Sequence, residues 1–257
     1  MKLQKIAITA LLILIIAISI TKVAPWAADP TNHAHSIEQT DDKIATVMAL
    51  SGGAAATSAA ISLLPGDVCT PISEELAELA KYFLVILSAL YLEKFLITIS
   101  GYITFSVLIP AALLLLSIAI LFGKKNLGSI AGKIAVVGLA IFIIVPASVW
   151  LSDKVYQTQA DRVNSTIEQY NDMEDDGDTG FFDQITTVTT NTVDKATNFL
   201  SSLLEALAVM IVTACVIPIL VFVFLIWLIK TIFAGNTLTL DTGSLLSLKD
   251  KLVNNSN

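Results

Sequence analysis

The charged residues of this chain fall into two populations of opposite sign, separated by long apolar runs. The short pieces at 1–5, at 124–133 and after residue 229 hold eight lysines against two carboxylates. The two long connections are acidic: 21–80 holds eight carboxylates against two lysines, and 152–202 holds ten against three cations. A chain that threads a membrane shows such sorting, because basic loops stay on the cytoplasmic side. The sequence therefore predicts a membrane protein and its orientation.

The apolar runs are long enough to cross a bilayer. Hydrophobic residues make up 55% of the 257 residues, and the mean hydropathy is +0.77. Residues 206–229 contain no charge across 24 positions, and 134–152 are uncharged across 19; about 20 apolar residues span the hydrocarbon core as a helix. We therefore expect an all-α integral membrane protein with three transmembrane helices, at 103–123, 134–152 and 203–230.

The N-terminal segment, 1–27, is either a signal peptide or a membrane anchor. Its apolar run follows Lys2 and Lys5, as in both kinds of segment. A small-residue cleavage site fits poorly, because Pro25 or Trp26 occupies the −3 position. The 16 residues of Ile6–Thr21 are nevertheless short for a span. Both alternatives stay open, and both place residue 28 outside the cytoplasm.

The stretch 82–123 is the ambiguous one, because Glu93 and Lys94 interrupt it after 11 uncharged residues. A helical hairpin turning around 100–102 would place the basic loop 124–133 outside the cell. A single crossing keeps every basic cluster inside, so we expect one long helix that begins near Thr70 and Pro71. Residues 28–102 then form an exoplasmic helical region leading into this helix, and 231–257 form a cytoplasmic tail.

Two other segments of the exoplasmic region are distinctive. Residues 153–202 are acidic and predict a helical hairpin that returns to the last span. Residues 51–60 are almost all Gly, Ala, Ser and Thr, with small residues four apart, which allows another helix to approach closely. We favour packing of this segment within the chain over an oligomer interface.

The acidic segment 172–183 resembles the calcium loop of EF-hand proteins over twelve residues. Its spacing offers hard oxygen ligands around Gly177. Position 3 is Glu, position 12 is Asp and position 8 is Thr, which all depart from the pattern, so a solvated acidic turn is the simpler alternative. Calcium is the only cofactor that the sequence suggests, and its candidate ligands are Asp172, Glu174, Asp176, Asp178 and Asp183.

The second helix carries the polar residues closest to the membrane. Glu93 is an ionisable group about ten residues outside the apolar core segment, where pairing with another exoplasmic helix is expected. Thr98, Tyr102 and Ser106 recur every four residues, and Ser100 and Thr104 lie on a neighbouring face. Such hydroxyls line a pore or bond a neighbouring helix, and bonds between helices are the commoner case.

The spans contain no group on which catalysis or ion-coupled transport usually depends. Segments 95–123, 134–152 and 206–229 hold no charged, amide or imidazole side chain. We therefore expect a non-enzymatic, multi-pass protein of the plasma membrane with a cytoplasmic C-terminus. The leading hypothesis is an envelope interaction or assembly scaffold whose partners are the lipid bilayer and copies of itself or other envelope proteins, without nucleic acid. The alternative is an oligomeric channel lined by the hydroxyls of the second helix.

Overall fold

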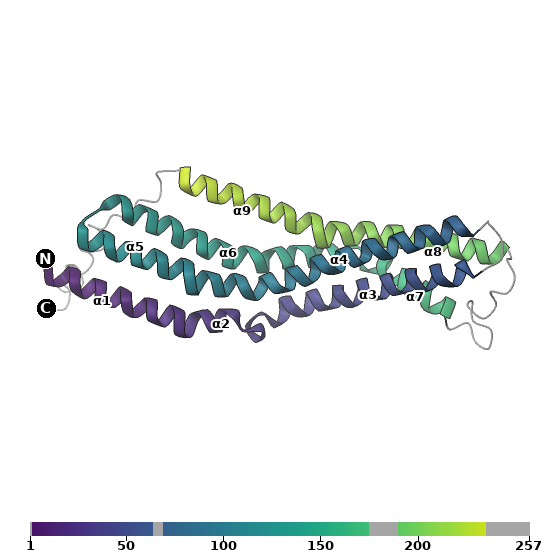
Figure 1. The fold of residues 1–257 in the computed structure, drawn as a ribbon, viewed down its shortest axis with the longest axis horizontal. Coiled ribbons are helices and arrows are strands. Elements are labelled where there is room, and N and C mark those ends of the chain that lie inside the picture. Colours follow the sequence, from purple (N-terminus) through teal and green to yellow (C-terminus); the bar gives the residue numbers. More distant parts are fainter. Residues whose placement is uncertain (1, 64–68, 175–189, 235–257) are drawn as a thin grey trace. The chain divides into compact units, whose positions relative to one another are not determined.

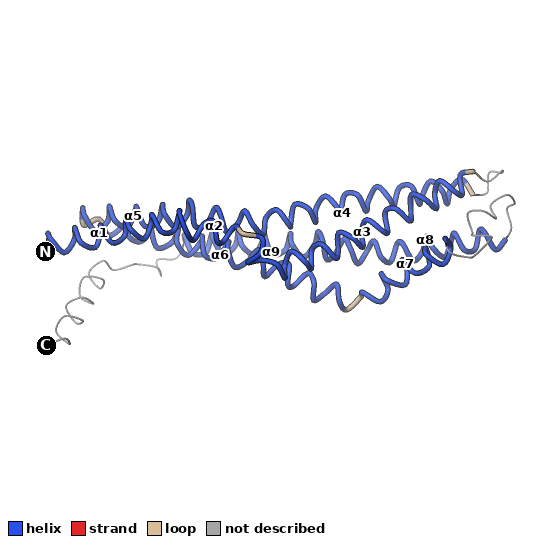
Figure 2. Tube along the Cα trace, turned by 90° about the horizontal axis from the view of Figure 1, so that it is seen from below, coloured by secondary structure: helices blue, strands red, loops and turns tan. Residues whose placement is uncertain are grey.

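The computed structural model describes residues 2–63, 69–174 and 190–234, and these are helical almost throughout, with no strand among them (Figures 1 and 2). The α-helices are α1 (Lys2–Ile18), α2 (Ala24–Ala28), α3 (Ala34–Ser62), α4 (Thr70–Ile103), α5 (Ile109–Phe122), α6 (Lys125–Gln157), α7 (Ala160–Glu174), α8 (Thr190–Ile211) and α9 (Ile217–Ala234). Short π-helical segments η1 (Ser19–Val23), η3 (Thr104–Leu108) and η5 (Val212–Val216) and the 3-10 helix η2 (Pro30–His33) join some of them. The all-α fold class is confirmed.

Five helical stretches among the described residues are long and apolar enough to cross a membrane, by length and composition, whereas the sequence predicted three transmembrane helices plus an N-terminal signal peptide or anchor. They are Gln4–Ala28, Pro30–Ser62, Thr70–Phe122, Asn126–Gln157 and Val193–Ala234. The additional stretch is Pro30–Ser62, within the region 28–102 that was expected to be helical and exoplasmic. Asp29 precedes this stretch and caps η2 by accepting hydrogen bonds from the N–H and hydroxyl of Thr31, which also lower the pKa of Asp29.

The long helix 70–122 does not turn back at 100–102. Helix α4 begins at Thr70 and Pro71, passes through η3 into α5, and ends at Gly123, whose φ of 68° is the left-handed conformation of a helix end. The N–H of Lys124 closes this end by donating to the carbonyl of Ala119. The hairpin alternative for 82–123 is therefore wrong for the fold of the chain.

Each π-helical segment is followed by a proline at the second position of the next helix. In η3 the N–H of Ile109 donates to the carbonyl of Thr104, five residues back. The next residue is Pro110, which has no N–H, so the carbonyl of Phe105 loses its helical donor. The hydroxyl of Ser19 supplies one at 2.7 Å. A side chain from one helical segment thus supplies the hydrogen bond that the backbone of another lacks.

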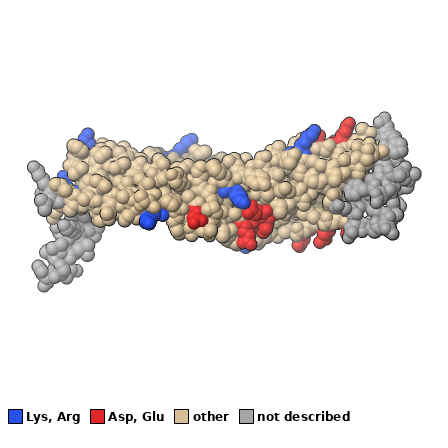
Figure 3. Space-filling model, turned by 60° about the horizontal axis from the view of Figure 1, so that its bottom comes forward, with Lys and Arg blue, Asp and Glu red and all other residues tan. Residues whose placement is uncertain are grey.

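The chain divides into two compact units. Unit 1 comprises Met1–Ala34, Leu96–Ala147 and Val221–Asn257, and unit 2 comprises His35–Phe95 and Ser148–Leu220. Among the described residues of unit 1, Asp29 is the only carboxylate, whereas those of unit 2 hold fourteen. On the face drawn in Figure 3, most of the surface is neither acidic nor basic and the carboxylates gather in a few patches.

In unit 1, α1 packs along α5, and close approaches of backbone to backbone hold the neighbouring segments. A Cβ at Gly101 would lie 2.2 Å from the carbonyl oxygen of Ala27, so this position needs glycine. The hydroxyl of Thr104 donates to the carbonyl of Gly138 on α6. The ammonium of Lys133 donates to the carbonyl of Phe233 and thereby caps the end of α9.

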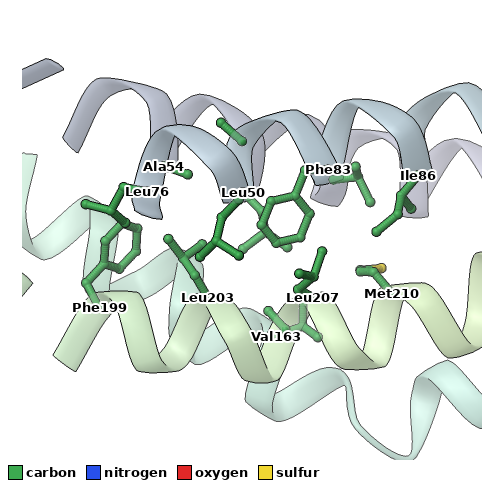
Figure 4. Packing of buried hydrophobic residues seen from close by; sticks show 14 of the residues in the cluster. Leu50, Ala54, Leu76, Phe83, Ile86, Val163, Phe199, Leu203, Leu207 and Met210 are labelled. Carbon is green, nitrogen blue, oxygen red and sulfur yellow. The ribbon is translucent and has the colours of Figure 1, made fainter. Parts of the chain in front are cut away.

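In unit 2, α3, α4, α7 and α8 enclose one apolar core (Figure 4). Its central side chains are Leu50, Phe83, Val163, Leu203 and Met210, all almost fully buried. The small-residue segment 51–60 packs within this unit, since a Cβ at Gly53 would lie 3.1 Å from the ring of Tyr170. The buried small residues of this segment therefore pack against other helices of the same chain, rather than at an exposed oligomer interface.

Candidate functional site

Beside this core lies a set of buried polar side chains, which we name the buried polar cluster. Its members come from four elements: Lys43 on α3, Glu93 on α4, Ser152 and Asp153 on α6, and Thr213 in η5. Lys43 is 1% exposed and Glu93 7%. Lys43 interacts electrostatically with the carboxyl groups of both Glu93 and Asp153. Charged groups are rarely buried without partners, so the hydrogen bonds of each member decide what the cluster does.

Lys43, Ser152 and Thr213 form a continuous hydrogen-bond chain. The ammonium of Lys43 donates to the hydroxyl of Ser152 at 2.7 Å, and that hydroxyl donates to the carbonyl of Thr213. The carbonyl is available because η5 has π-helical bonds five residues apart, and the residue five positions on is Pro218. The π-helical segment thus creates an acceptor, and Ser152 connects it to the buried ammonium.

Asp153 is satisfied by amide donors. The side-chain amide of Gln39 donates to Oδ2 of Asp153 at 2.7 Å, and that of Gln157 donates to the same oxygen at 2.6 Å. The ammonium of Lys43 also lies over the ring of Tyr156, 5.9 Å from its centre. The hydrogen bonds of Asp153 are thus made by the amides of two glutamine side chains.

Glu93 is the exception in the cluster. Both of its carboxylate oxygens are buried, and neither has a hydrogen-bond partner among the described residues. Pairing with another helix was expected for this residue, and it does face the ammonium of Lys43 electrostatically, but the two are not within 4.0 Å. Its neighbour Lys94 pairs instead with Asp41 on α3. The Oε1 atom of Gln39 is likewise buried and unpartnered.

The hydroxyl stripe predicted on the second helix, at Thr98, Tyr102 and Ser106, belongs to unit 1. Tyr102 is about half exposed, and Ser106 donates to the carbonyl of Tyr102 in its own helix. Thr98 is half-buried. The neighbouring face of this helix is the packed one, because Ser100 and Thr104 are buried and Thr104 bonds to α6. A pore role for the stripe stays a prediction.

The predicted calcium loop falls largely outside the described residues. Asp172 and Glu174 belong to the last turn of α7. Asp176, Asp178 and Asp183 are not among the residues that the structure describes. Within the described part of the chain, no three carboxylate, histidine or cysteine side chains come together as a metal site. Calcium binding therefore stays a prediction that rests on the spacing alone.

Sequence reasoning missed Lys43, Ser152 and Thr213. Two signals pointed to them: Lys43 is the last charge before a run of small and apolar residues, and Pro218 interrupts an apolar helix. Neither signal names its partner, because the contacts join residues 61 and 109 positions apart. A scan against protein-family models matches none, and searches of curated proteins and of solved structures return no match. The geometry alone therefore guides the functional inference.

Proposed function

We propose that this protein is a non-enzymatic component of the plasma membrane and cell envelope that assembles through the exoplasmic surface of α4. The observation that carries the proposal is an exposed apolar stripe on this helix, which we name the α4 stripe. Its large side chains are each more than half exposed in unit 2. They are Leu84, Val85, Tyr91, Leu92 and Phe95.

The division of carboxylates between the units supports the membrane placement. Unit 1 has almost no acidic side chain among its described residues and contains the basic connection Lys124–Lys125, which fits a membrane unit with its cytoplasmic edge there. Unit 2, with its fourteen carboxylates, fits the exoplasmic side. The N-terminal helix is then a retained anchor, because Ser19 and Ala27 make contacts on which α4 and α5 depend.

The last span is shifted toward the C-terminus in this proposal. Thr213, expected within the span at 203–230, belongs to unit 2 and receives its hydrogen bond from Ser152. The span then lies mainly in α9, whose carbonyl at Phe233 is capped by Lys133. At 1.5 Å per residue, α6 rises about 29 Å from Lys133 to Ser152, close to the roughly 30 Å of a hydrocarbon core.

Lipid does not provide the cover for the α4 stripe in this arrangement. Four of its five side chains lie in an uncharged run of 11 residues, from Tyr82 to Leu92, which rises only about 16 Å, half of what a bilayer core requires; Phe95 follows the charged residues Glu93 and Lys94. Charged side chains lie at both ends: Lys81 before the stripe and Lys94 with Asp41 near its end. Exposed apolar side chains in water favour a protein partner.

A second copy of this chain is the partner that we propose. Leu84 and Tyr91 lie seven residues apart, as do Val85 and Leu92, so the stripe returns to the same face of the helix every two turns. Two copies in one membrane share their orientation, and a two-fold axis along the membrane normal brings the same stripe of each copy together. The contact is therefore self-complementary.

Disulfide cross-linking tests this proposal. In a variant without native cysteines, Val85→Cys or Leu92→Cys is expected to give a covalent dimer under mild oxidation in membranes. Glu168→Cys, also exposed in unit 2 but on α7, is the matched control and is expected to stay monomeric. Equal cross-linking at all three positions, or none at 85 and 92, would contradict the α4 dimer.

The channel hypothesis keeps one supporting observation, namely that Tyr102 lies at the surface of the chain, as a pore formed by several copies requires. Its test is electrical. Conductance that appears with the assembled protein in planar bilayers and changes with Tyr102→Phe would support the channel, whereas an electrically silent oligomer would remove it.

A further inference from the structure

Glu93 lies at a level of unit 2 that water reaches, although its own side chain is buried. It precedes the span predicted at 103–123 by ten residues. The ion pair between Lys94 and Asp41 is partly exposed, and Glu38 and Asp42 on α3 are exposed. Glu93 is therefore buried next in the chain to a partly exposed ion pair, and α3, which carries Lys43 of the cluster, also carries exposed carboxylates.

The cluster has more negative than positive charge, and its hydrogen bonds bypass Glu93. It contains two carboxyl groups, Glu93 and Asp153, against the single ammonium of Lys43. Lys43 donates to Ser152, and Gln39 and Gln157 donate to Asp153. Among the residues that the structure describes, none donates to either oxygen of Glu93 or to the Oε1 atom of Gln39, and all three atoms are buried. A buried carboxylate in this condition is costly, and one proton removes its charge.

We propose that Glu93 is a proton-binding site of unit 2, whose carboxyl group takes up a proton where α4 packs against α3. Its surroundings agree with this assignment. Of the cations in the described part of the chain, Lys43 on α3 is the one that acts on it, and it lies beyond ion-pair distance. Asp153 on α6 competes for the same ammonium, and Cys215 in η5 is an uncharged neighbour at neutral pH. Lys94, next in the chain, is occupied by Asp41.

Proton uptake links the packing of α4 to the external pH. Burial raises the pKa of the Glu93 carboxyl from 4.5 to about 6, against the opposing effect of Lys43. A group whose pKa is higher in the folded state stabilises that state fully below its unfolded pKa, near 4.5, and this contribution is lost as the pH rises through about 6. The unit is therefore expected to become less stable over this interval.

Infrared spectroscopy of the full chain in detergent tests the site directly. Acidification from about pH 8 to about pH 5 is expected to produce the carbonyl band of a protonated carboxylic acid, because ordinary carboxyl groups titrate lower. Glu93→Gln should remove this band, and Glu75→Gln, an exposed carboxyl on the same helix, should leave it. A band that survives in Glu93→Gln, or that is absent from the native protein, overturns the proposal.

Thermal unfolding provides a second readout that does not depend on the dimer. Glu93→Gln mimics the neutral carboxyl, so its unfolding temperature should vary less between about pH 4.5 and pH 6 than that of the native protein. Lys43→Met removes the cation that favours the charged form, so its infrared band should persist to higher pH. If the two variants leave the band and the pH profile unchanged, Glu93 is not the site of protonation.

Discussion

At the scale of single residues, the prolines of this protein act through the carbonyl groups that they leave without a donor. Pro110 leaves the carbonyl of Phe105 to Ser19, and Pro218 leaves that of Thr213 to Ser152. In both cases the preceding π-helical segment shifts the orphan carbonyl to five residues before the proline. The prolines are visible in the sequence, but the serines that donate to the freed carbonyl groups lie 86 and 61 positions from them in the chain.

Removal of the Ser152 hydroxyl tests the hydrogen-bond chain. Ser152→Ala leaves the ammonium of Lys43 and the carbonyl of Thr213 without their bonds, and the expected loss in free energy of unfolding is about 1.5–3 kcal/mol. Thermal or denaturant unfolding in detergent measures it. Ser201→Ala is the control, because that exposed hydroxyl bonds only to its own helix and should cost little.

A second substitution, Pro218→Ala, tests whether the proline is what frees the carbonyl of Thr213 for Ser152. Alanine restores an N–H to the helix, so the carbonyl of Thr213 regains a backbone donor. Ser152→Ala should then cost about 1 kcal/mol less in the Pro218→Ala background than in the native protein. Equal costs in the two backgrounds would show that Pro218 does not create the acceptor.

At the scale of elements, the sequence predicted the long helix correctly. Thr70 and Pro71 mark a helix start that needs no tertiary partner, and the rejected turn at 100–102 has no proline to enforce it. Ser36 and Gln39 have the spacing of a capping box in the sequence, but α3 begins at Ala34, and Gln39 donates to Asp153 instead. A contact with another helix thus used the side chain that a local cap would require.

The glycines of α3 and α4 allow a test of helix packing. Gly101→Ala places a methyl group against the carbonyl of Ala27, and overpacking of this kind typically costs about 1–3 kcal/mol. Gly52→Ala meets nothing within 4 Å, and it should stabilise the exposed helix by about 0.5–1 kcal/mol. Unfolding measurements on both variants should therefore give opposite signs, and the same sign would argue against the close approach of Ala27.

At the scale of the whole molecule, the sorted charges and the two structural units support the same division. The basic clusters fall in unit 1, and nearly every described carboxylate falls in unit 2. The sorting of the charges is a property of the sequence alone, whereas the two units are defined by contacts between residues. The proposed membrane unit and exoplasmic unit would lead one to expect this agreement. A fifth stretch, Pro30–Ser62, is also long and apolar enough to cross a membrane.

Labelling of single cysteines in intact cells tests this division. In a Cys69→Ala, Cys215→Ala background, a membrane-impermeant maleimide should modify Glu168→Cys, which is exposed on α7. Asn126→Cys, exposed at the start of α6, should react only after the cells are permeabilised. The opposite result would invert the topology, and reaction at both positions in sealed cells would contradict any fixed side for unit 2.

The sequence alone determined the helical fold class, the membrane class and the side on which each connection is expected. These properties follow from local composition and from charge, which act without regard to distant neighbours. Only the tertiary structure decided that Lys43 and Glu93 are buried together, that the stripe at 98, 102 and 106 is not the packing face, and that Thr213 belongs with Ser152. Each of these depends on which helices meet and in what register, and a single sequence does not specify that register.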